Sequence, residues 1–499
     1  MGIGSAIQQY ILMPRDGLRD KAMLDPLLHP DRQPKLLSAM LRAQPKNKEP
    51  KRVTGQIKVI DSVHEDGMKL AELTPEAIFN LRSTLPGVRV VPVIHYRTAD
   101  RRYFVESVFS RAGKASGDLE ISVRCRSTGA PLPGATVVAF TNFAEREGAT
   151  GTTDKMGTVR LFPSRNSISL ERLLIYPPHG YWGFSSKDAR VSSGDKFTLQ
   201  PIDLARDDLL RDLYGHSEMS AGTGVVIGVI DTGVANTHPD LQLMSARNMV
   251  TGEKPNDDRT SGDHGTHVAG IVASRGTAPT GLRGLAPGVT LRSYRVFGIG
   301  KETATNYDIA KAIDQAVADG CHLINLSLGS DTRDFALEAS INDAYRSGTL
   351  SICATGNDYR KPVLFPAAFQ EVLAVSALGQ EGTFPVDSVE AFDVADPHAS
   401  SNKNRFIGAF SNIGQEVALT APGVGIISTA PQQDCAVMSG TSMACPAVTG
   451  CLAKALGEEP NLLSIPADSN RTEAFIRTAL RKAVQQGFGV ALEGHGLME

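Results

Sequence analysis

Residues 225–233 read Val225-Val226-Ile227-Gly228-Val229-Ile230-Asp231-Thr232-Gly233. Six residues without a polar side chain predict a strand that is buried on both faces, as in a parallel sheet. The carboxylate of Asp231 follows at the carboxyl end of that strand. Ligands of open parallel sheets bind beyond the carboxyl ends of the strands, so we expect a site there.

Strands and helices alternate on either side of this stretch. Further strands are predicted at 290–296, 322–326 and 350–354, and helices at 264–273, 308–318, 335–345 and 447–456. The alternation predicts an α/β fold, a doubly wound parallel sheet with helices on both faces. We expect this domain to span residues 204–499.

Two smaller domains are predicted upstream. Residues 1–105 combine predicted strands at 56–60, 69–73 and 88–94 with a helix that Thr74 caps before Pro75, which indicates a small α+β domain. Residues 106–203 hold short strands between Gly and Pro turns, which indicates a small β-sandwich-like accessory domain. Whether this domain is a spacer or a binding module, and for which ligand, stays open at this point.

Composition narrows the classes of function and location. With 21% charged residues, 41% hydrophobic residues and a net charge of −3, the chain is a globular protein, and neither nucleic acid nor a membrane is expected as a partner. Six cysteines among 499 residues are too sparse for a disulfide framework and are expected to be free thiols. The first residues lack the basic region of a secretion signal, so we expect a cytoplasmic protein and leave non-classical export open.

Polar residues with complementary chemistry stand at several element ends. Besides Asp231, His264 opens a predicted helix within Gly262–Gly270, and Ser442 leads into another within Met438–Pro446. A serine hydroxyl becomes a nucleophile when an imidazole takes its proton, and a buried carboxylate orients that imidazole. Asn357 follows a predicted strand, where its amide could donate a hydrogen bond to an oxyanion.

Three stretches carry a family resemblance: Val229–Gly233, His264–Gly270 and Gly440–Ala444. They resemble the three signatures of the subtilisin-like serine proteases, the subtilases of peptidase family S8, whose order of catalytic residues is also Asp, His, Ser. The resemblance implies a serine endopeptidase that acts on protein or peptide substrates. It implies Asp231 as orienting carboxylate, His264 as general base and acid, Ser442 as nucleophile, and Asn357 with the Ser442 backbone N–H as oxyanion hole.

The same resemblance implies where substrate binds. Ser327, Leu328 and Gly329 resemble the strand to which substrate adds, and Ala354, Thr355 and Gly356 resemble the facing wall. Leu364 is expected at the base of the main pocket. We therefore expect an apolar or aromatic residue before the cleaved bond, the P1 residue.

Residues 1–105 resemble the inhibitory propeptide of this family, which implies a zymogen whose own N-terminal domain inhibits it. Two alternatives stay open: a peptide ligase or macrocyclase on the same scaffold, and a latent scaffold protein with a silenced protease domain. The natural substrate, the oligomeric state, and whether and where the precursor is cleaved are likewise open.

Metal binding, two buried-type residues and an acidic stretch are further features of the sequence. No cofactor and no metal site are expected; calcium stays open, with Asp240 as one oxygen ligand whose partners are not evident. His267 is expected to be structural, and Cys445 to be a packing residue rather than a redox sensor. The stretch between Ala377 and Phe410 holds acidic residues that favour either basic substrates or, preferably, a solvated loop; they are Asp387, Glu390, Asp393 and Asp396.

Overall fold

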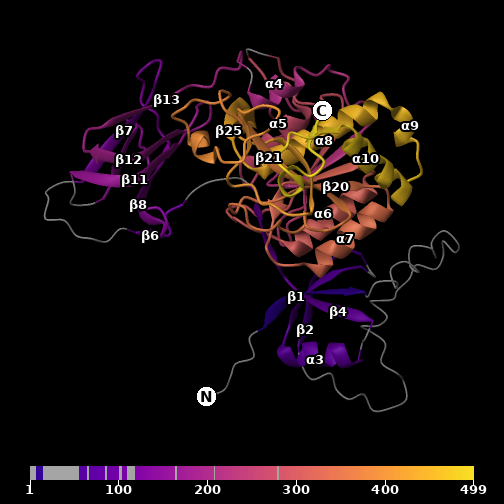
Figure 1. Cartoon of the computed structure of the whole chain (residues 1–499). Helices are drawn as coiled ribbons and strands as arrows, with labels where there is room; N and C mark the ends of the chain where they lie inside the picture. The colour runs from indigo at the N-terminus through magenta and orange to yellow at the C-terminus, as the bar shows by residue number, and fades with distance from the viewer. Residues whose placement is uncertain are drawn as a thin grey trace, which may run out of the picture.

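The structure is a computed structural model and describes residues 7–14, 56–64, 67–84, 87–99, 104–108, 118–162, 166–206, 208–277 and 280–499. Figure 1 shows three units: a large α/β unit, a small unit of early strands below it, and a β unit at its side. β1 (Gln8–Pro14) lies in the small unit.

The largest sheet carries the candidate site. Its parallel strands are β14 (Val226–Asp231), β15 (Leu243–Asn248), β16 (Thr290–Arg295), β18 (Leu323–Leu326), β20 (Leu350–Ala354), β21 (Val372–Gln380) and β23 (Val417–Pro422). They stand in the order β15-β16-β14-β18-β20-β21-β23, each parallel to its neighbour. Beyond β23 the sheet is extended by β27 (Leu497–Met498) and β26 (Ala483–Val484), and β22 (Arg405–Ile407) pairs antiparallel with the end of β21.

Helices cover both faces of this sheet. α5 (His264–Ala273) and α8 (Thr441–Glu458) pack on one face, and α6 (Asn306–Ala318) and α7 (Phe335–Arg346) on the other. The side chains of β14 alternate accordingly: Ile227 and Val229 join the first core, and Ile230 joins the second. The predicted α/β fold with a parallel sheet is confirmed.

Further elements complete the α/β unit. They are α4 (Leu209–Tyr214), α9 (Pro460–Leu463), α10 (Ser469–Arg481), α11 (Val490–Glu493), the 3₁₀ turns η1 (Val389–Asp393) and η2 (Pro431–Gln433), the two-residue strands β17 (Ala304–Thr305) and β19 (Leu328–Gly329), and the hairpin β24 (Ile426–Ala430) with β25 (Asp434–Met438).

In its described residues, the small unit is a four-stranded antiparallel sheet with one helix. Its strands stand in the order β2-β3-β1-β4, and its elements are β1, β2 (Ile57–Ser62), β3 (Lys69–Leu73), α3 (Pro75–Thr84) and β4 (Val88–Pro92). One face of the sheet packs on α3 and the other shares a core with α6 and α7. Asp61 also forms an ion pair with Lys311 of α6 at 2.8 Å. The unit is thereby held against the large one, and it leads into β5 (His95–Thr98).

The β unit holds two sheets over one core. The smaller sheet has the order β10-β7-β13, and the larger has the order β12-β11-β8-β9-β6. The bounds are β6 (Ser107–Val108), β7 (Leu119–Cys125), β8 (Thr136–Asn142), β9 (Glu147–Thr152), β10 (Thr158–Leu161), β11 (Ser167–Tyr176), β12 (Phe184–Ser192) and β13 (Lys196–Leu199). Alternating burial along β7 explains the facing sheets, because every second side chain points into the shared core.

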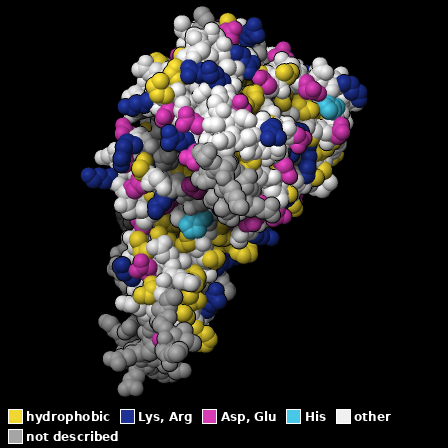
Figure 2. All heavy atoms as spheres, turned by 90° about the vertical axis from the view of Figure 1, so that its left-hand side faces the viewer, with side chains coloured by type: hydrophobic (Ala, Val, Ile, Leu, Met, Phe, Trp, Pro, Cys, Tyr) yellow, Lys and Arg dark blue, Asp and Glu magenta, His cyan; other side chains and the backbone are white. Residues whose placement is uncertain are grey.

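The surface around the β unit mixes both signs of charge. On the face that carries this unit, basic and acidic side chains are interspersed (Figure 2). Within the described ranges, no helix is long and apolar enough to cross a bilayer.

Candidate active site

The Asp231 carboxylate and the His264 imidazole are in direct contact. Both are buried, and Nδ1 of His264 lies 2.8 Å from Oδ1 and 3.0 Å from Oδ2 of Asp231. Asp231 Oδ1 also accepts a hydrogen bond from the backbone N–H of Thr232 at 2.6 Å. The carboxylate can therefore fix the ring orientation and stabilise an imidazolium.

A glycine makes this contact possible. A Cβ atom on Gly265 would lie 2.4 Å from the carbonyl oxygen of Gly233, a distance that real Cβ atoms do not adopt. The first turn of α5 can therefore lie directly on the loop after β14, which brings His264 beside Asp231.

Ser442 lies in the first turn of α8, because this helix begins at Thr441 and not at the predicted Ala447. Pro446 lies inside the helix and has no N–H to donate to the carbonyl of Ser442. The Ser327 hydroxyl donates to that carbonyl instead, at 3.0 Å, and the Ser442 hydroxyl donates to the Ser327 carbonyl at 3.1 Å. Since α5 and α8 pack together on one face of the sheet, both helices present their first turns at the same edge.

A carbonyl oxygen of the chain itself lies between the two predicted oxyanion-hole donors. The Ala99 carbonyl accepts hydrogen bonds from the backbone N–H of Ser442, at 3.2 Å, and from the side-chain amide of Asn357. Thr441 fixes that amide, because its N–H and hydroxyl donate to Asn357 Oδ1 at 2.9 and 3.0 Å. The amide nitrogen of Asn357 is thereby directed at Ala99.

Residues 95–99 occupy the predicted substrate cleft as an added strand. β5 pairs antiparallel with β19, with Thr98 opposite Leu328 and Arg97 opposite Gly329, and the Ala99 N–H donates to the Ser327 carbonyl at 3.1 Å. On its other side β5 pairs with β17, with Tyr96 opposite Ala304. The chain runs from this strand directly to the two donors at Ser442 and Asn357.

The segment that faces the other edge of β5 is not the expected one, residues 354–356. β5 does not pair with the expected wall of Ala354, Thr355 and Gly356. The Thr355 N–H donates to the Val375 carbonyl, and the Thr355 carbonyl accepts from the Leu364 N–H. The Gly356 N–H donates to Thr441 Oγ1 at 3.1 Å. β17 takes the expected place. No pattern in the sequence marks a strand of two residues, and the pairing arises because β5 lies there.

Leu364 narrows the pocket that would receive the P1 side chain. Its side chain lies between Gly329 and Gly356, where a Cβ on either glycine would come within 2.8 Å of Leu364 Cδ1. The space next to Ala99 is therefore small, in contrast to the predicted pocket for an apolar or aromatic residue.

Tyr96 and Asp334 form a buried polar pair that the sequence analysis missed. The Tyr96 hydroxyl donates to Asp334 Oδ2 at 3.1 Å, and both residues are fully buried. Burial, together with the Asp334 charge, raises the pKa of Tyr96, and burial also raises the pKa of Asp334. Asp334 Oδ1 caps α7 by accepting from the N–H groups of Ala336 and Leu337. The position of Asp334 before a predicted helix is typical of an N-cap. The contact of its second oxygen with Tyr96 was not predictable from the sequence.

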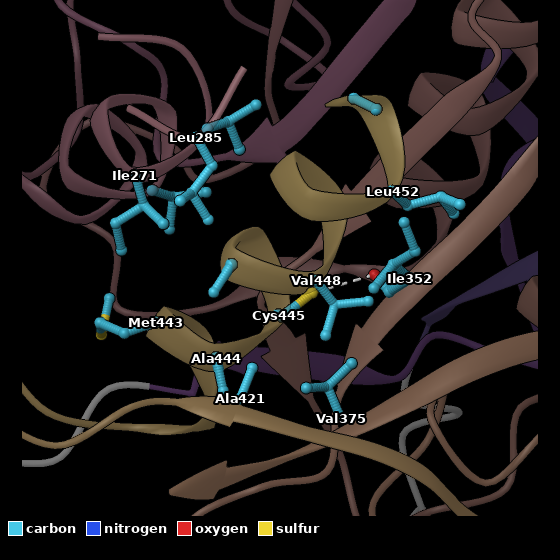
Figure 3. Packing of buried hydrophobic residues seen from close by; sticks show 14 of the residues in the cluster. Ile271, Leu285, Ile352, Val375, Ala421, Met443, Ala444, Cys445, Val448 and Leu452 are labelled. Atoms are coloured by element: carbon cyan, nitrogen blue, oxygen red, sulfur yellow. Dashed lines mark hydrogen bonds between the residues drawn. The ribbon is translucent and has the colours of Figure 1, made fainter. Parts of the chain in front are cut away.

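His267 and Cys445 have the geometry of structural residues. His267 is buried, its Nε2 lies 3.0 Å from the Ile426 carbonyl and 3.1 Å from that of Ala436, and burial lowers its pKa to about 3. Cys445 is buried among apolar side chains of α8 and the sheet, and its thiol donates to the Ile352 carbonyl at 3.1 Å (Figure 3). Burial raises the pKa of this thiol, which disfavours the reactive thiolate.

The remaining predicted acidic residues divide into two groups. Asp240, the candidate calcium ligand, accepts a hydrogen bond from the Leu282 N–H at 3.1 Å, and the described part of the chain has no cluster of His, Cys, Asp and Glu suited to a metal ion. In the acidic stretch, Asp396 is exposed and Asp387 is half-buried, but Glu390 and Asp393 are buried. The expected solvated loop is therefore wrong for Glu390 and Asp393.

Comparisons with known proteins agree with this geometry. Residues 222–495 match the subtilase family of peptidases S8. The chain belongs to the subtilase family. It is 35% identical to subtilisin DY of Bacillus licheniformis over 245 residues, which is 48% of this chain and 80% of that protein. It is 34% identical to subtilisin BL and 33% identical to subtilisin Savinase, both of Lederbergia lenta, each over 57% of this chain and 91% of the relative.

Membership of the family fixes the class of activity. The chain is a subtilisin-like serine endopeptidase, a hydrolase that acts on protein or peptide substrates. The predicted cytoplasmic location is wrong, because the relationship to subtilisins, which are secreted extracellular proteases, conflicts with it.

Proposed function

We propose that this subtilase cleaves peptide bonds through an acyl-enzyme formed on Ser442 and is made as a precursor that cleaves itself after Ala99. The observation that carries the proposal is the Ala99 carbonyl, which accepts hydrogen bonds from the Ser442 N–H and the Asn357 amide. A substrate carbonyl would bind these donors in the same way. The bond to be cleaved would then be Ala99–Asp100.

The chemistry follows from the groups around that carbonyl. The Ser442 hydroxyl must first release the Ser327 carbonyl. His264 Nε2 then takes its proton as Oγ attacks the carbonyl carbon, and Asp231 stabilises the imidazolium through Nδ1. The oxyanion is stabilised by the Ser442 N–H and the Asn357 amide. His264 then donates the proton to the departing amine, and water hydrolyses the ester by the same route in reverse. No cofactor takes part in these steps.

We propose three domains with separate roles. Residues 1–105 are the propeptide-like domain, and its part up to Ala99 inhibits by leaving β5 in the cleft after cleavage, supported by the pairing of β5 with β17 and β19. Residues 106–203 are a β-sandwich-like accessory domain, and residues 204–499 are the peptidase. Calcium is not needed for the proposed chemistry.

We propose that specificity rests on the two buried side chains of residues 95–99, those of Tyr96 and Ala99. A small P1 residue such as Ala99 suits the space that Leu364 leaves, and the hydroxyl of a P4 tyrosine such as Tyr96 suits Asp334. Ser327, Leu328 and Gly329 supply the main-chain pairing, and Ala354, Thr355 and Gly356 supply the wall of the P1 pocket.

Active-site labelling tests the proposed nucleophile. We expect a fluorophosphonate to label the processed wild-type chain at Ser442 and casein hydrolysis to disappear in Ser442→Ala. Undiminished hydrolysis by Ser442→Ala would exclude the assigned nucleophile. Products that contain a new amide bond would instead favour a ligase, and absence of label in the processed chain would favour a scaffold protein.

A further inference from the structure

A pocket lies where the β unit meets the peptidase. The β unit contributes residues 176–179, Tyr181 and Gly183, and the peptidase contributes Asp263, Val389, Glu390 and residues 436–439. The pocket is open to solvent, so a substrate side chain can enter it from outside.

The pocket and β5 lie on opposite sides of the catalytic residues. Asp263 directly precedes His264, and Ser439 lies just before α8, the helix whose first turn holds Ser442. The cleft strand β5 lies on the other side, where it pairs with β17 and β19, and none of those strands lines the pocket. A substrate that continues past the cleaved bond therefore leads toward the pocket, so the pocket belongs to the leaving-group side.

A buried carboxylate lines the pocket without a full set of partners. Glu390 is only 6% exposed, and its Oε1 accepts a hydrogen bond from the Ser439 hydroxyl at 3.4 Å. Oε2 is also buried and has no hydrogen-bond partner among the residues that the structure describes. A buried charged oxygen is costly to leave unpaired, so this atom favours a ligand that brings a donor.

His179 of the β unit lies beside two carboxylates of the peptidase. Nε2 of His179 lies 2.8 Å from Oδ2 of Asp263, and its Nδ1 lies 4.0 Å from Oδ2 of Asp434. The β unit is held close by further contacts, since Ser185 donates to the carbonyls of Asp387 and Ser388 at 2.8 and 2.6 Å. The wall from the β unit is therefore fixed in position next to Glu390 and Asp263.

We propose that this pocket binds the basic side chain of a substrate residue within the three positions that follow the cleaved bond. This inference rests on the proposed function and adds to it the substrate class on the leaving-group side. A guanidinium supplies paired N–H donors that match a carboxylate such as Glu390. The chain's own sequence after Ala99 reads Asp100-Arg101-Arg102, which is the kind of sequence that the pocket would select. The accessory domain thereby becomes part of the substrate-binding surface.

A matched pair of peptides tests the proposal on the wild-type protein after cleavage at Ala99, with the β unit and the peptidase both present. The first peptide has the sequence of residues 96–103, Tyr-Arg-Thr-Ala-Asp-Arg-Arg-Tyr, and the second has citrulline in place of both arginines after the cleaved bond. Citrulline keeps the shape of arginine and removes its charge. We expect kcat/KM to be roughly 5- to 10-fold higher for the arginine peptide, as for one charge-assisted hydrogen bond in a partly open site.

Two variants test whether the pocket causes the preference for the arginine peptide. Glu390→Gln keeps the shape of the side chain, and we expect it to bring the ratio of the two kcat/KM values close to one. Glu416→Gln changes an exposed carboxylate outside the pocket lining, and we expect it to keep the wild-type ratio. Equal rates for both peptides in the wild type, or an unchanged ratio in Glu390→Gln, would overturn the proposal.

Acyl transfer provides a second readout that needs no variant. A wild-type acyl-enzyme partitions between water and an added amine, and we expect Asp-Arg-Arg amide to capture more of it than Asp-citrulline-citrulline amide. Equal capture also contradicts the proposal. If neither peptide is cleaved and a fluorophosphonate fails to label Ser442, the proposed function itself has failed.

Discussion

The carbonyl oxygen of Ala99 accepts a hydrogen bond from the backbone N–H of Ser442 at 3.2 Å. This single contact joins the small N-terminal unit to the first turn of α8. Because the Asn357 amide donates to the same oxygen, Ala99 occupies the position that a substrate carbonyl needs.

Removal of the side-chain donor reduces the rate of the chemical step. For Asn357→Leu we expect kcat to fall by roughly 100- to 1000-fold, the cost known for the oxyanion-hole asparagine of subtilisin, a relative of this chain, while KM changes little. Thr441→Ser keeps a hydroxyl and an N–H for Asn357 Oδ1 and serves as control. Steady-state kinetics on a peptide with the sequence before Asp100 provide the measurement. A kcat of Asn357→Leu within tenfold of the wild type would contradict the assignment.

The size of the Leu364 side chain sets the P1 preference. Leu364→Ala opens space between Gly329 and Gly356, and we expect the kcat/KM ratio of a P1 leucine peptide to a P1 alanine peptide to rise by at least roughly 10-fold. Leu480→Ala, a partly buried leucine on α10, serves as the matched control. If both variants keep the wild-type ratio, Leu364 does not limit the pocket.

Asp334 recognises the hydroxyl of a tyrosine four residues before the cleaved bond. We expect a Tyr-Arg-Thr-Ala peptide to exceed a Phe-Arg-Thr-Ala peptide in kcat/KM by roughly 5- to 10-fold, because phenylalanine leaves a buried carboxylate oxygen without its donor. Asp334→Asn retains the oxygen that caps α7, and it should reduce this discrimination without loss of the fold. Preference for phenylalanine in the wild type would refute the assigned role.

The stability of the protein rises with pH because His267 is buried in the neutral form. Burial lowers its pKa to about 3, so between pH 3 and the unfolded value of about 6.5 the unfolded chain binds more protons than the folded one. The His267 contribution is fully present above about pH 6.5 and is lost as the pH falls toward 3, by at most about 1.4 kcal/mol per pH unit.

Chemical unfolding of Ser442→Ala between pH 4 and 8 measures this dependence without self-cleavage. His267→Asn in the same background should reduce the slope of unfolding free energy against pH by up to one proton. The Ser442→Ala, Cys451→Ser double variant retains His267 and serves as the control. An identical slope in the presence and absence of His267 would contradict a neutral buried imidazole.

Elements with a strong local pattern were predictable from the sequence. β20 and α5 have the predicted limits, since each is set by an apolar run or a helix start that the residues themselves encode. The start of α8 was predicted too late, because Pro446 normally marks a first turn. Here the Ser327 hydroxyl satisfies the Ser442 carbonyl, so the helix continues through the proline.

Features that depend on distant segments were not predictable. His95–Thr98 has no periodicity of its own and becomes a strand only between β17 and β19. The partner of Tyr96 is likewise set by packing, since Asp334 stands at the start of α7. Glu390 was visible as one acid in an acidic stretch, but its burial beside the β unit required the assembled domains.

Intact-mass analysis of the purified wild type beside Ser442→Ala tests self-cleavage after Ala99 most directly. We predict two fragments for the wild type, which end at Ala99 and begin at Asp100, and one uncut chain for Ser442→Ala. An uncut wild type, a cut at another bond, or the same cut in Ser442→Ala would contradict the account.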